Sequence, residues 1–255
     1  MCGLAGILLY PTERSEAEWQ AIRQCFTQTL LYNEERGREA SGVALIRREG
    51  TVRLFKGPVP ASELVHSEEY RAALDRLDAE TTCLLGHARA PTKGSRWNNA
   101  NNHPLLAGQV IGIHNGHIHN DDELFAEWGF PRLGQVDSEI IFRLLDAVPP
   151  DGQSPADYLP VVQERIALLQ GRFATLSVHL NRPEWLLVLR NGMPLCVHYH
   201  RPWQALCFSS RYLFLRKAFG REVITERLDS GQAYLFDATR LPELGGEPIG
   251  TIALE

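Results

Sequence analysis

The chain has 255 residues, of which 44% are hydrophobic and 22% are charged. This is an ordinary globular composition, long enough for a full hydrophobic core, and it excludes a disordered, collagen-like or coiled-coil protein. The 26 Lys and Arg residues against 31 Asp and Glu give a net charge of -5, so no nucleic-acid partner is expected. No apolar run reaches the roughly 18 to 20 residues that span a bilayer, so the sequence predicts a soluble protein with no membrane partner.

The cysteines indicate a reducing compartment. Five occur, without any C-x-x-C pair: Cys2, Cys25, Cys83, Cys196 and Cys207. The odd count favours free thiols and a cytoplasmic protein. The apolar segment at 3–10 has no basic region before it, which argues against a signal peptide and predicts a first strand.

Hydrophobic periodicity and turn signals predict the elements of the first half of the chain. In order, these are a strand at 3–10, a helix from a capping box at Ser15 and Glu18 to Gly37, strands at 41–48 and 51–57 joined by a tight turn, a helix over 62–78 and a buried strand at 82–89. The next segment, 90–104, is dense in Gly, Pro, Asn and Ser. It predicts a long exposed loop of the kind that acts as a lid.

The second half of the chain predicts alternating helices and strands. In order, these are a strand at 109–116 that ends in a turn, a helix capped by Asn120 and running to Trp128, a helix opened by Asp137, a helix around 161–169, strands at 172–180, 184–191, 194–200 and 204–210, a helix at 211–219, and a closing strand pair near 222–237. This order suggests packed sheets covered by helices. The linker-like stretch at 149–155 is too short to mark a boundary, so one domain over 1–255 is predicted.

Cys2 is the most informative residue for chemistry. The initiator methionine is usually removed before a small residue, which would leave Cys2 with its own free α-amine. An α-amine with a pKa of about 7.7 to 8.0 can accept the proton of a thiol with a pKa of about 8.5. Nucleophile and base would then belong to one residue. The alternative is a cysteine without a role at a frayed terminus.

Three further features supply candidate binding groups. Asn115 and Gly116 end a predicted strand, where their N–H groups can stabilise an oxyanion, although Asn-Gly is also a common turn. Arg89 follows a buried strand and suits a carboxylate or a surface ion pair. Asp137 starts a helix, which it either caps or leaves to face an ammonium group. With a thiol nucleophile, these are the groups that hydrolysis of an amino-acid amide needs.

Six segments resemble, in order, the motifs of class II glutamine amidotransferases. They are MCGLAGI at 1–7, RGREASGVAL at 36–45, GHARAPTKG at 86–94, NNHP at 101–104, HNGHIHNDDEL at 114–124 and VDSEIIFRLL at 136–145. The glutaminase domains of glucosamine-6-phosphate synthase and of glutamine phosphoribosylpyrophosphate amidotransferase are the most similar, and asparagine synthetase is a more distant match. Later segments also look like this domain, so the resemblance covers nearly the whole chain.

The resemblance implies the α+β fold of the N-terminal nucleophile hydrolases, a four-layer αββα sandwich of two stacked antiparallel sheets flanked by helices. By similarity, Cys2 attacks the side-chain amide of glutamine, releases ammonia and forms a γ-glutamyl thioester that water hydrolyses to glutamate. Asn115 and Gly116 would form the oxyanion hole. Arg89 would bind the substrate α-carboxylate, and Asp137 would bind the α-amino group.

Three residues have supporting places in this comparison. Thr92 corresponds to a family position that lines the glutamine site, and Arg36 to one near the nucleophile. His114 directly precedes the oxyanion pair. No cofactor is implied for this half-reaction.

The lid segment departs from the family pattern. Ala90 and Pro91 follow Arg89 where relatives often have an aromatic residue, and Lys93 replaces a common histidine. The segment between Gly37 and Ser41 also lacks the usual Tyr-Asp or Gln-Glu pair. These departures concern lid closure and the gating of ammonia.

No synthase-like segment follows the glutaminase-like region before Glu255. The resemblance therefore predicts a stand-alone glutaminase subunit that passes ammonia in trans to an acceptor synthase. One alternative is a hydrolase of another γ-glutamyl amide. Another is an inactive module that binds glutamine or regulates a partner. Oligomeric state is left open by the sequence.

The histidines also suggest a metal site, because His114, His117 and His119 lie close together and His103 precedes them. Zinc needs three or four ligands, which the sequence does not place together. Structural or supporting roles are favoured, and no metal is predicted.

Overall fold

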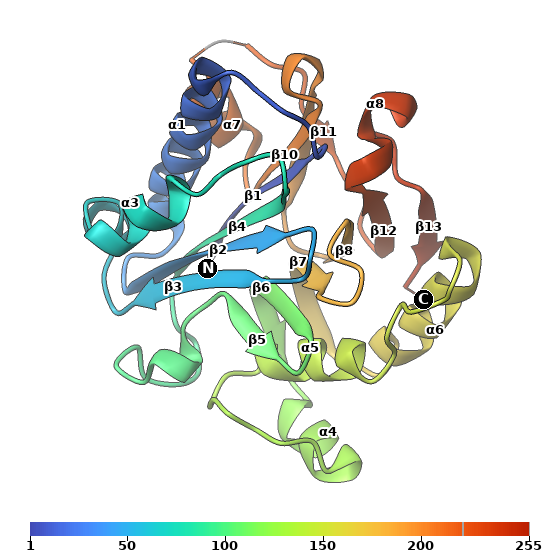
Figure 1. Ribbon diagram of the computed structural model, residues 1–255. Helices are drawn as coiled ribbons and strands as arrows, with labels where there is room; N and C mark the ends of the chain where they lie inside the picture. Colours follow the sequence, from blue (N-terminus) through green and yellow to red (C-terminus); the bar gives the residue numbers. More distant parts are fainter. Residues whose placement is uncertain (221, 255) are drawn as a thin grey trace.

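The structure is a computed structural model that describes residues 1–220 and 222–254. Two antiparallel sheets stack face to face, with helices covering both outer faces (Figure 1). This arrangement confirms the predicted α+β sandwich with its αββα layers. None of the helices within the described ranges has the length and apolar character needed to cross a membrane.

The first sheet has seven strands in the order β11-β9-β10-β1-β4-β2-β3. Their bounds are β1 (Gly3–Leu9), β2 (Ala40–Arg47), β3 (Val52–Gly57), β4 (Thr81–Arg89), β9 (Cys196–His200), β10 (Ala205–Ser209) and β11 (Glu226–Arg227). The second sheet has six strands in the order β13-β12-β8-β7-β6-β5. Their bounds are β5 (Leu105–Ala107), β6 (Val110–Ile118), β7 (Gly171–His179), β8 (Trp185–Asn191), β12 (Gln232–Asp237) and β13 (Gly250–Ala253).

The helices divide between the two outer faces. Those packed on the first sheet are α1 (Glu16–Asn33), α2 (Ala61–Leu64), α3 (Glu68–Leu74) and α7 (Tyr212–Phe219). Those packed on the second sheet are α4 (Asp121–Trp128), α5 (Ser138–Asp146) and α6 (Pro155–Ile166), and the short α8 (Leu241–Leu244) follows β12.

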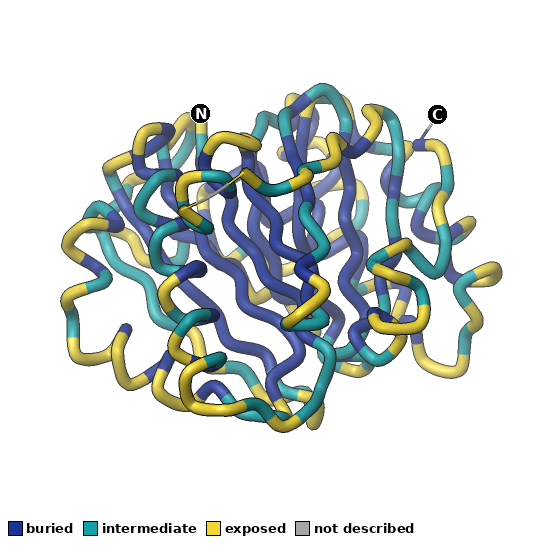
Figure 2. Tube along the Cα trace, turned by 90° about the horizontal axis from the view of Figure 1, so that it is seen from above, coloured by how far each residue is buried: buried dark blue, intermediate teal, exposed yellow. Residues whose placement is uncertain are grey.

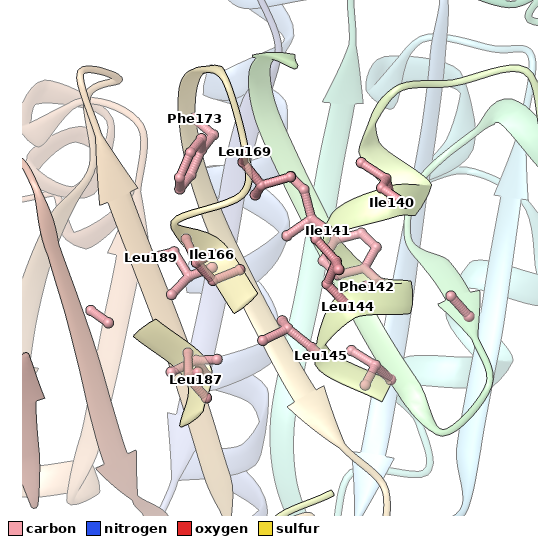
Figure 3. Close-up of a cluster of buried hydrophobic side chains, with 14 of the residues drawn as sticks. Ile140, Ile141, Phe142, Leu144, Leu145, Ile166, Leu169, Phe173, Leu187 and Leu189 are labelled. Carbon is pink, nitrogen blue, oxygen red and sulfur yellow. The ribbon is translucent and has the colours of Figure 1, made fainter. Parts of the chain in front are cut away.

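Three hydrophobic clusters hold the layers together. One fills the space between the sheets, where alternate side chains of β1, β4, β6 and β7 meet. A second lies between the first sheet and α1. The third lies between the second sheet and α5 and α6, where Ile166 of α6 lies beside Leu189 of β8 (Figure 3). The central strands of both sheets are buried in the middle of the molecule, with exposed residues in the surrounding loops and helices (Figure 2).

Several predicted boundaries agree with the structure, and the capping box of α1 is present as expected. The helix predicted over 62–78 is wrong in one respect, because it consists of two short helices. The Ser67 side chain accepts the Tyr70 N–H and starts α3 as a separate helix. The predicted closing strand pair is also wrong, since β11 pairs with β9 whereas β12 pairs with β8 and β13.

The strand that contains Asn115 and Gly116 continues to Ile118, so the predicted turn at these residues is wrong. Strand β7 supplies antiparallel partners along this whole segment, which satisfies its backbone groups. Asn120 precedes α4 as predicted, but its side chain makes no cap. Its amide instead bonds the backbone of Leu168 and Gln170.

The sheet register brings the start of the chain to the functional residues. In the antiparallel β1–β4 pair, Gly3 lies opposite Ala88. The residue before Gly3 therefore lies beside the end of β4. Strand β6 of the second sheet packs against both β1 and β4.

Candidate active site

Cys2 directly precedes β1 and is partly exposed. Its Sγ contacts the Ala90 carbonyl oxygen at 3.6 Å, and its own carbonyl accepts the Arg36 Nε–H at 2.7 Å. Gly3 allows this placement, because a Cβ there would lie 2.5 Å from the Asn33 carbonyl oxygen at the end of α1. The structure thus holds Cys2 at its carbonyl group and at its thiol.

The electrostatics around Cys2 favour a protonated thiol. Burial raises the pKa of the Cys2 thiol, while the positive charges of the chain terminus and Arg89 lower it and the Asp137 carboxylate raises it. The net shift is upward. A thiol of this kind needs a nearby base before it can attack a carbonyl.

Arg89 is 2% exposed and holds the loop that follows it. Its Nη2 donates to the carbonyl oxygens of Lys93 and Gly94 at 2.8 and 3.0 Å, and its Nη1 donates to Asn102 Oδ1 at 2.9 Å. An arginine has five N–H donors, so further donors remain on the guanidinium. The predicted carboxylate clamp therefore also anchors the predicted lid.

Two lysines fasten the same loop at other points. Lys56 Nζ donates to the carbonyl oxygens of Asn102 and Pro104 at 2.6 and 2.9 Å, and burial lowers its pKa to about 8. Lys93 Nζ donates to the carboxylates of Asp121 and Asp122 at the start of α4. The segment 90–104 is thus held near both of its ends.

Asn115 and Gly116 lie on β6 at the predicted position. Gly116 has φ of 148°, and a Cβ at this position would overlap the Arg172 carbonyl oxygen of β7, so only glycine fits. The Asn115 side chain is fully buried, and neither its Nδ2 nor its Oδ1 has a hydrogen-bond partner within the described structure. Unpaired buried amides are rare and costly, and a catalytic role is one of the reasons why a protein keeps one.

Asp137 does not cap α5, which excludes the first of its two predicted roles. Its Oδ2 instead accepts the Ile118 N–H at 2.8 Å and lies 3.3 Å from His117 Nδ1. The carboxylate is 4% exposed. A buried carboxylate held in this way is suited to a cationic group of a ligand.

Six of the eight predicted residues line one pocket: Cys2, Arg89, Thr92, His114, Gly116 and Asp137. The pocket has a volume of about 20 Å³, enough for about one water molecule. Asn115 and Arg36 lie next to it, one before Gly116 on β6 and the other on the Cys2 carbonyl. The pocket is therefore smaller than an amino acid.

Sequence reasoning did not assign His103, Lys93 and Ser138 to the pocket, although they also line it. His114 Nδ1 lies 2.7 Å from Ser138 Oγ, which orients the imidazole. The His103 ring stacks on His87 at 4.3 Å, and burial lowers the pKa of both well below the usual range of histidine. The histidine in NNHP was the available signal, but its distance in sequence from Cys2 gave no sign that both line the same pocket.

The described residues contain no group of three or more His, Cys, Asp or Glu side chains placed to hold a metal ion. His117 and His119 stack edge to face at 4.7 Å. His87 Nε2 lies 2.9 Å from the His114 carbonyl oxygen. These histidines thus contact one another and the backbone.

No family model matches the chain. Among curated proteins, it is 28% identical over 200 residues to glutamine–fructose-6-phosphate aminotransferase of Staphylococcus epidermidis and 31% identical over 201 residues to that of Caulobacter vibrioides, in each case over 77% of this chain and 30% of the relative. It is 27% identical over 216 residues to 7-cyano-7-deazaguanine synthase of Saccharolobus solfataricus, over 82% of this chain and 43% of the relative. The chain spans less than half the length of these relatives.

The structural comparison covers the whole chain. Glutamine phosphoribosylpyrophosphate amidotransferase from B. subtilis, solved with ADP and GMP, matches 100% of this chain and 49% of its own, with a TM-score of 0.70 and 17% sequence identity. This match shows the fold. Together with the sequence relatives, it confirms the family resemblance, and the chain is a homologue of the class II glutamine amidotransferases with their N-terminal nucleophile fold.

Proposed function

We propose that this chain hydrolyses the side-chain amide of glutamine to glutamate and ammonia, with Cys2 as the nucleophile. The observation that carries the proposal is the convergence of Cys2, Arg89, Gly116 and Asp137 on one pocket. A thiol, an oxyanion site, a cation and an anion are the groups that bind and cleave an amino-acid amide. The sequence relatives named as glutamine aminotransferases support this choice of substrate.

The reaction begins once Met1 has been removed and Cys2 carries a free α-amine. The amine takes the thiol proton as Sγ bonds to the amide carbon, and the carbonyl electrons move onto oxygen. The N–H groups at Asn115 and Gly116 would stabilise this oxyanion. On collapse the C–N bond breaks, and the leaving nitrogen takes the proton back as ammonia. The product on the enzyme is a γ-glutamyl thioester.

Water completes the cycle. The α-amine takes one proton from water as the hydroxyl oxygen bonds to the thioester carbon. The C–S bond then breaks, Sγ regains its proton, and glutamate leaves. Because burial raises the pKa of the Cys2 thiol, a base on the same residue solves the problem of forming the thiolate.

The ends of the substrate are assigned by charge. Arg89 would bind the α-carboxylate with the guanidinium N–H groups that do not donate to the loop, and Asp137 would bind the α-ammonium group. Thr92 on the loop would line the closed site, while Arg36 and His114 would hold the backbone of Cys2 and the wall of the pocket. Entry of glutamine requires the loop to open, since the closed pocket holds about one water molecule.

We further propose that the ammonia is used by a synthase. The relatives include an aminotransferase and a synthase, each more than twice as long as the matched region. In one form of this proposal, the synthase is a separate subunit that receives the ammonia in trans. Copurification of the two proteins tests this form. A reducing cytoplasmic location is consistent with the five free thiols of the described structure.

Release of glutamate and ammonia from glutamine by the purified, processed protein tests the proposal. We expect turnover by the wild type and none by Cys2→Ala. Comparison with γ-glutamyl amines distinguishes another γ-glutamyl amide substrate. Binding of glutamine without turnover, by protein whose Met1 has been removed, would instead indicate a regulatory module.

A further inference from the structure

Two buried histidines border the same pocket as Cys2. His103 is 3% exposed and His114 is 2% exposed, and both line the pocket with Cys2. Neither ring nitrogen of His103 has a hydrogen-bond partner within the described structure, and the same holds for Nε2 of His114. The other ring nitrogen of His114 lies 2.7 Å from Ser138 Oγ. Buried nitrogens without partners are rare and costly, and an ordered water is one of the groups that satisfies them.

The space beside these rings has the size of one water molecule. The pocket has a volume of about 20 Å³, and a water needs about 10 to 15 Å³ and two to four polar partners. The ring centres of His103 and His114 are 6.5 Å apart. This separation is too long for a direct hydrogen bond between the rings, and it fits a water whose oxygen is about 2.9 Å from one nitrogen of each. One water can therefore bridge the two imidazoles in the pocket that Cys2 lines.

Burial keeps both imidazoles uncharged. It lowers the pKa of His103 well below the usual range of histidine, and the positive charges of Lys56 and Arg89 lower it further. Burial also lowers the pKa of His114. A neutral imidazole has one nitrogen that accepts a hydrogen bond and one N–H that donates. The pair can thus offer a water both an acceptor and a donor.

We propose that His103, together with His114, holds the water that hydrolyses the γ-glutamyl thioester on Cys2. This inference rests on the proposed function, which assigns no side chain to that water. One proton of the water goes to the α-amine of Cys2 as the oxygen bonds to the thioester carbon, while the second O–H donates to the His103 ring. The C–S bond then breaks, and Sγ takes the proton from the α-amine. The second proton stays on the product carboxyl group, which ionises in solvent.

An activated ester separates the two half-reactions in the test. The γ-(p-nitrophenyl) ester of glutamate acylates Cys2 with release of coloured nitrophenolate, and the mass of the quenched protein then reports how fast the γ-glutamyl adduct is lost. His103→Phe keeps a ring to stack on His87 and removes both nitrogens. We expect this variant to release nitrophenolate at the wild-type rate in the first turnover. Its adduct should persist about tenfold longer, which is the effect of one lost hydrogen bond.

Two further variants separate a bond to water from a structural role. His103→Gln keeps an acceptor and a donor, so it should restore most of the rate of adduct loss. His179→Phe is the matched control, because His179 is also buried but lines a different cavity. Its adduct should be lost at the wild-type rate. Equal slowing of nitrophenolate release and of adduct loss in His103→Phe would indicate a structural role and overturn the inference.

Failure of this inference can be told from failure of the proposed function. Loss of the adduct at the wild-type rate in His103→Phe would overturn the inference, while the glutaminase proposal would stand. If the wild-type protein, with Met1 removed, forms no adduct on Cys2 from either the ester or glutamine, the proposed function fails and this inference fails with it.

Discussion

Lys93 and Asp121 join the loop over Cys2 to the start of α4, with 2.7 Å between Nζ and Oδ2. The Asp121 side chain is 4% exposed, and Arg132 binds the same oxygen at 2.7 Å from the other side. Asp122 accepts from both cations as well. Arg132 would still pair with both carboxylates if the contacts of Lys93 broke. The buried charge of Asp121 would then keep a partner, so the lysine contacts can break at a low cost.

Replacement of Lys93 should loosen the loop over 90–104. In Lys93→Met, we expect Cys2 to react with iodoacetamide several times faster than in the wild type, because the closed pocket limits access to the thiol. The unfolding free energy should change by about 1 kcal/mol or less, since Lys93 is partly exposed. Lys217→Met is the matched control, because it removes a surface pair with Glu35. An unchanged rate in Lys93→Met would show that the lysine does not hold the loop.

Asn115→Ala should separate activity from stability. Loss of one oxyanion donor lowers kcat by about 100-fold to 1000-fold. The unfolding free energy should change by no more than about 1 kcal/mol, because the amide has no hydrogen-bond partner to lose within the described structure.

Asn102→Ala provides the contrast, since that side chain accepts from Arg89 and donates to the Arg96 carbonyl. It should lose more stability than Asn115→Ala. Urea unfolding and steady-state kinetics measure both quantities, and a large stability loss in Asn115→Ala with intact kcat would contradict the assigned role.

Gly116→Ala should be among the most damaging single changes in β6. The residue has φ of 148°, and the new Cβ would meet the Arg172 carbonyl oxygen, so a cost of about 3 kcal/mol or more is expected. Gly129→Ala is the control, because that glycine has φ of 62° with nothing within 4 Å of a Cβ. It should cost about 1 kcal/mol, from backbone strain alone. Equal losses in urea unfolding would show that the β7 contact does not constrain Gly116.

The lowered pKa of Lys56 predicts the direction in which the unfolding free energy changes with pH. Burial lowers the pKa of Lys56 in the folded protein to about 8, below the value of about 10.4 for an unfolded lysine. Between these values the unfolded chain binds more protons, so stability rises with pH. The unfolding free energy of the wild type relative to Lys56→Met should therefore increase from about pH 8 to pH 10.4, by up to about 3 kcal/mol. A flat difference over this window would contradict the shifted pKa.

The local part of the fold could be predicted from the sequence. The Ser15–Glu18 spacing and the apolar periodicity after it predict α1, and the structure has both the capping box and the buried face. The break at Ser67 could not be predicted, because the same apolar pattern fits one helix or two. Asn120 has capping spacing, yet its amide binds Leu168 and Gln170. Partners far along the chain decided the Asn120 case, whereas the break at Ser67 comes from the local bond between the Ser67 side chain and the Tyr70 N–H.

The candidate site, like the fold, could be predicted only in part. The motifs predict which residue types gather near Cys2, because each keeps a fixed place on its own strand or helix. They do not predict that Arg89 also holds Lys93 and Gly94, or that Asp137 binds the Ile118 N–H rather than its own helix. They also do not predict that His103, near the end of the loop, lines the same pocket. Such contacts depend on the packing of the two sheets.

Labelling with 6-diazo-5-oxo-norleucine, a reactive mimic of glutamine, tests the central claim most directly. The masses of the intact protein and of its N-terminal peptide are measured after incubation. We predict loss of Met1 and a single adduct on Cys2, with protection by excess glutamine. A processed protein whose Cys2 remains unlabelled would contradict the assignment of this pocket as a glutamine site.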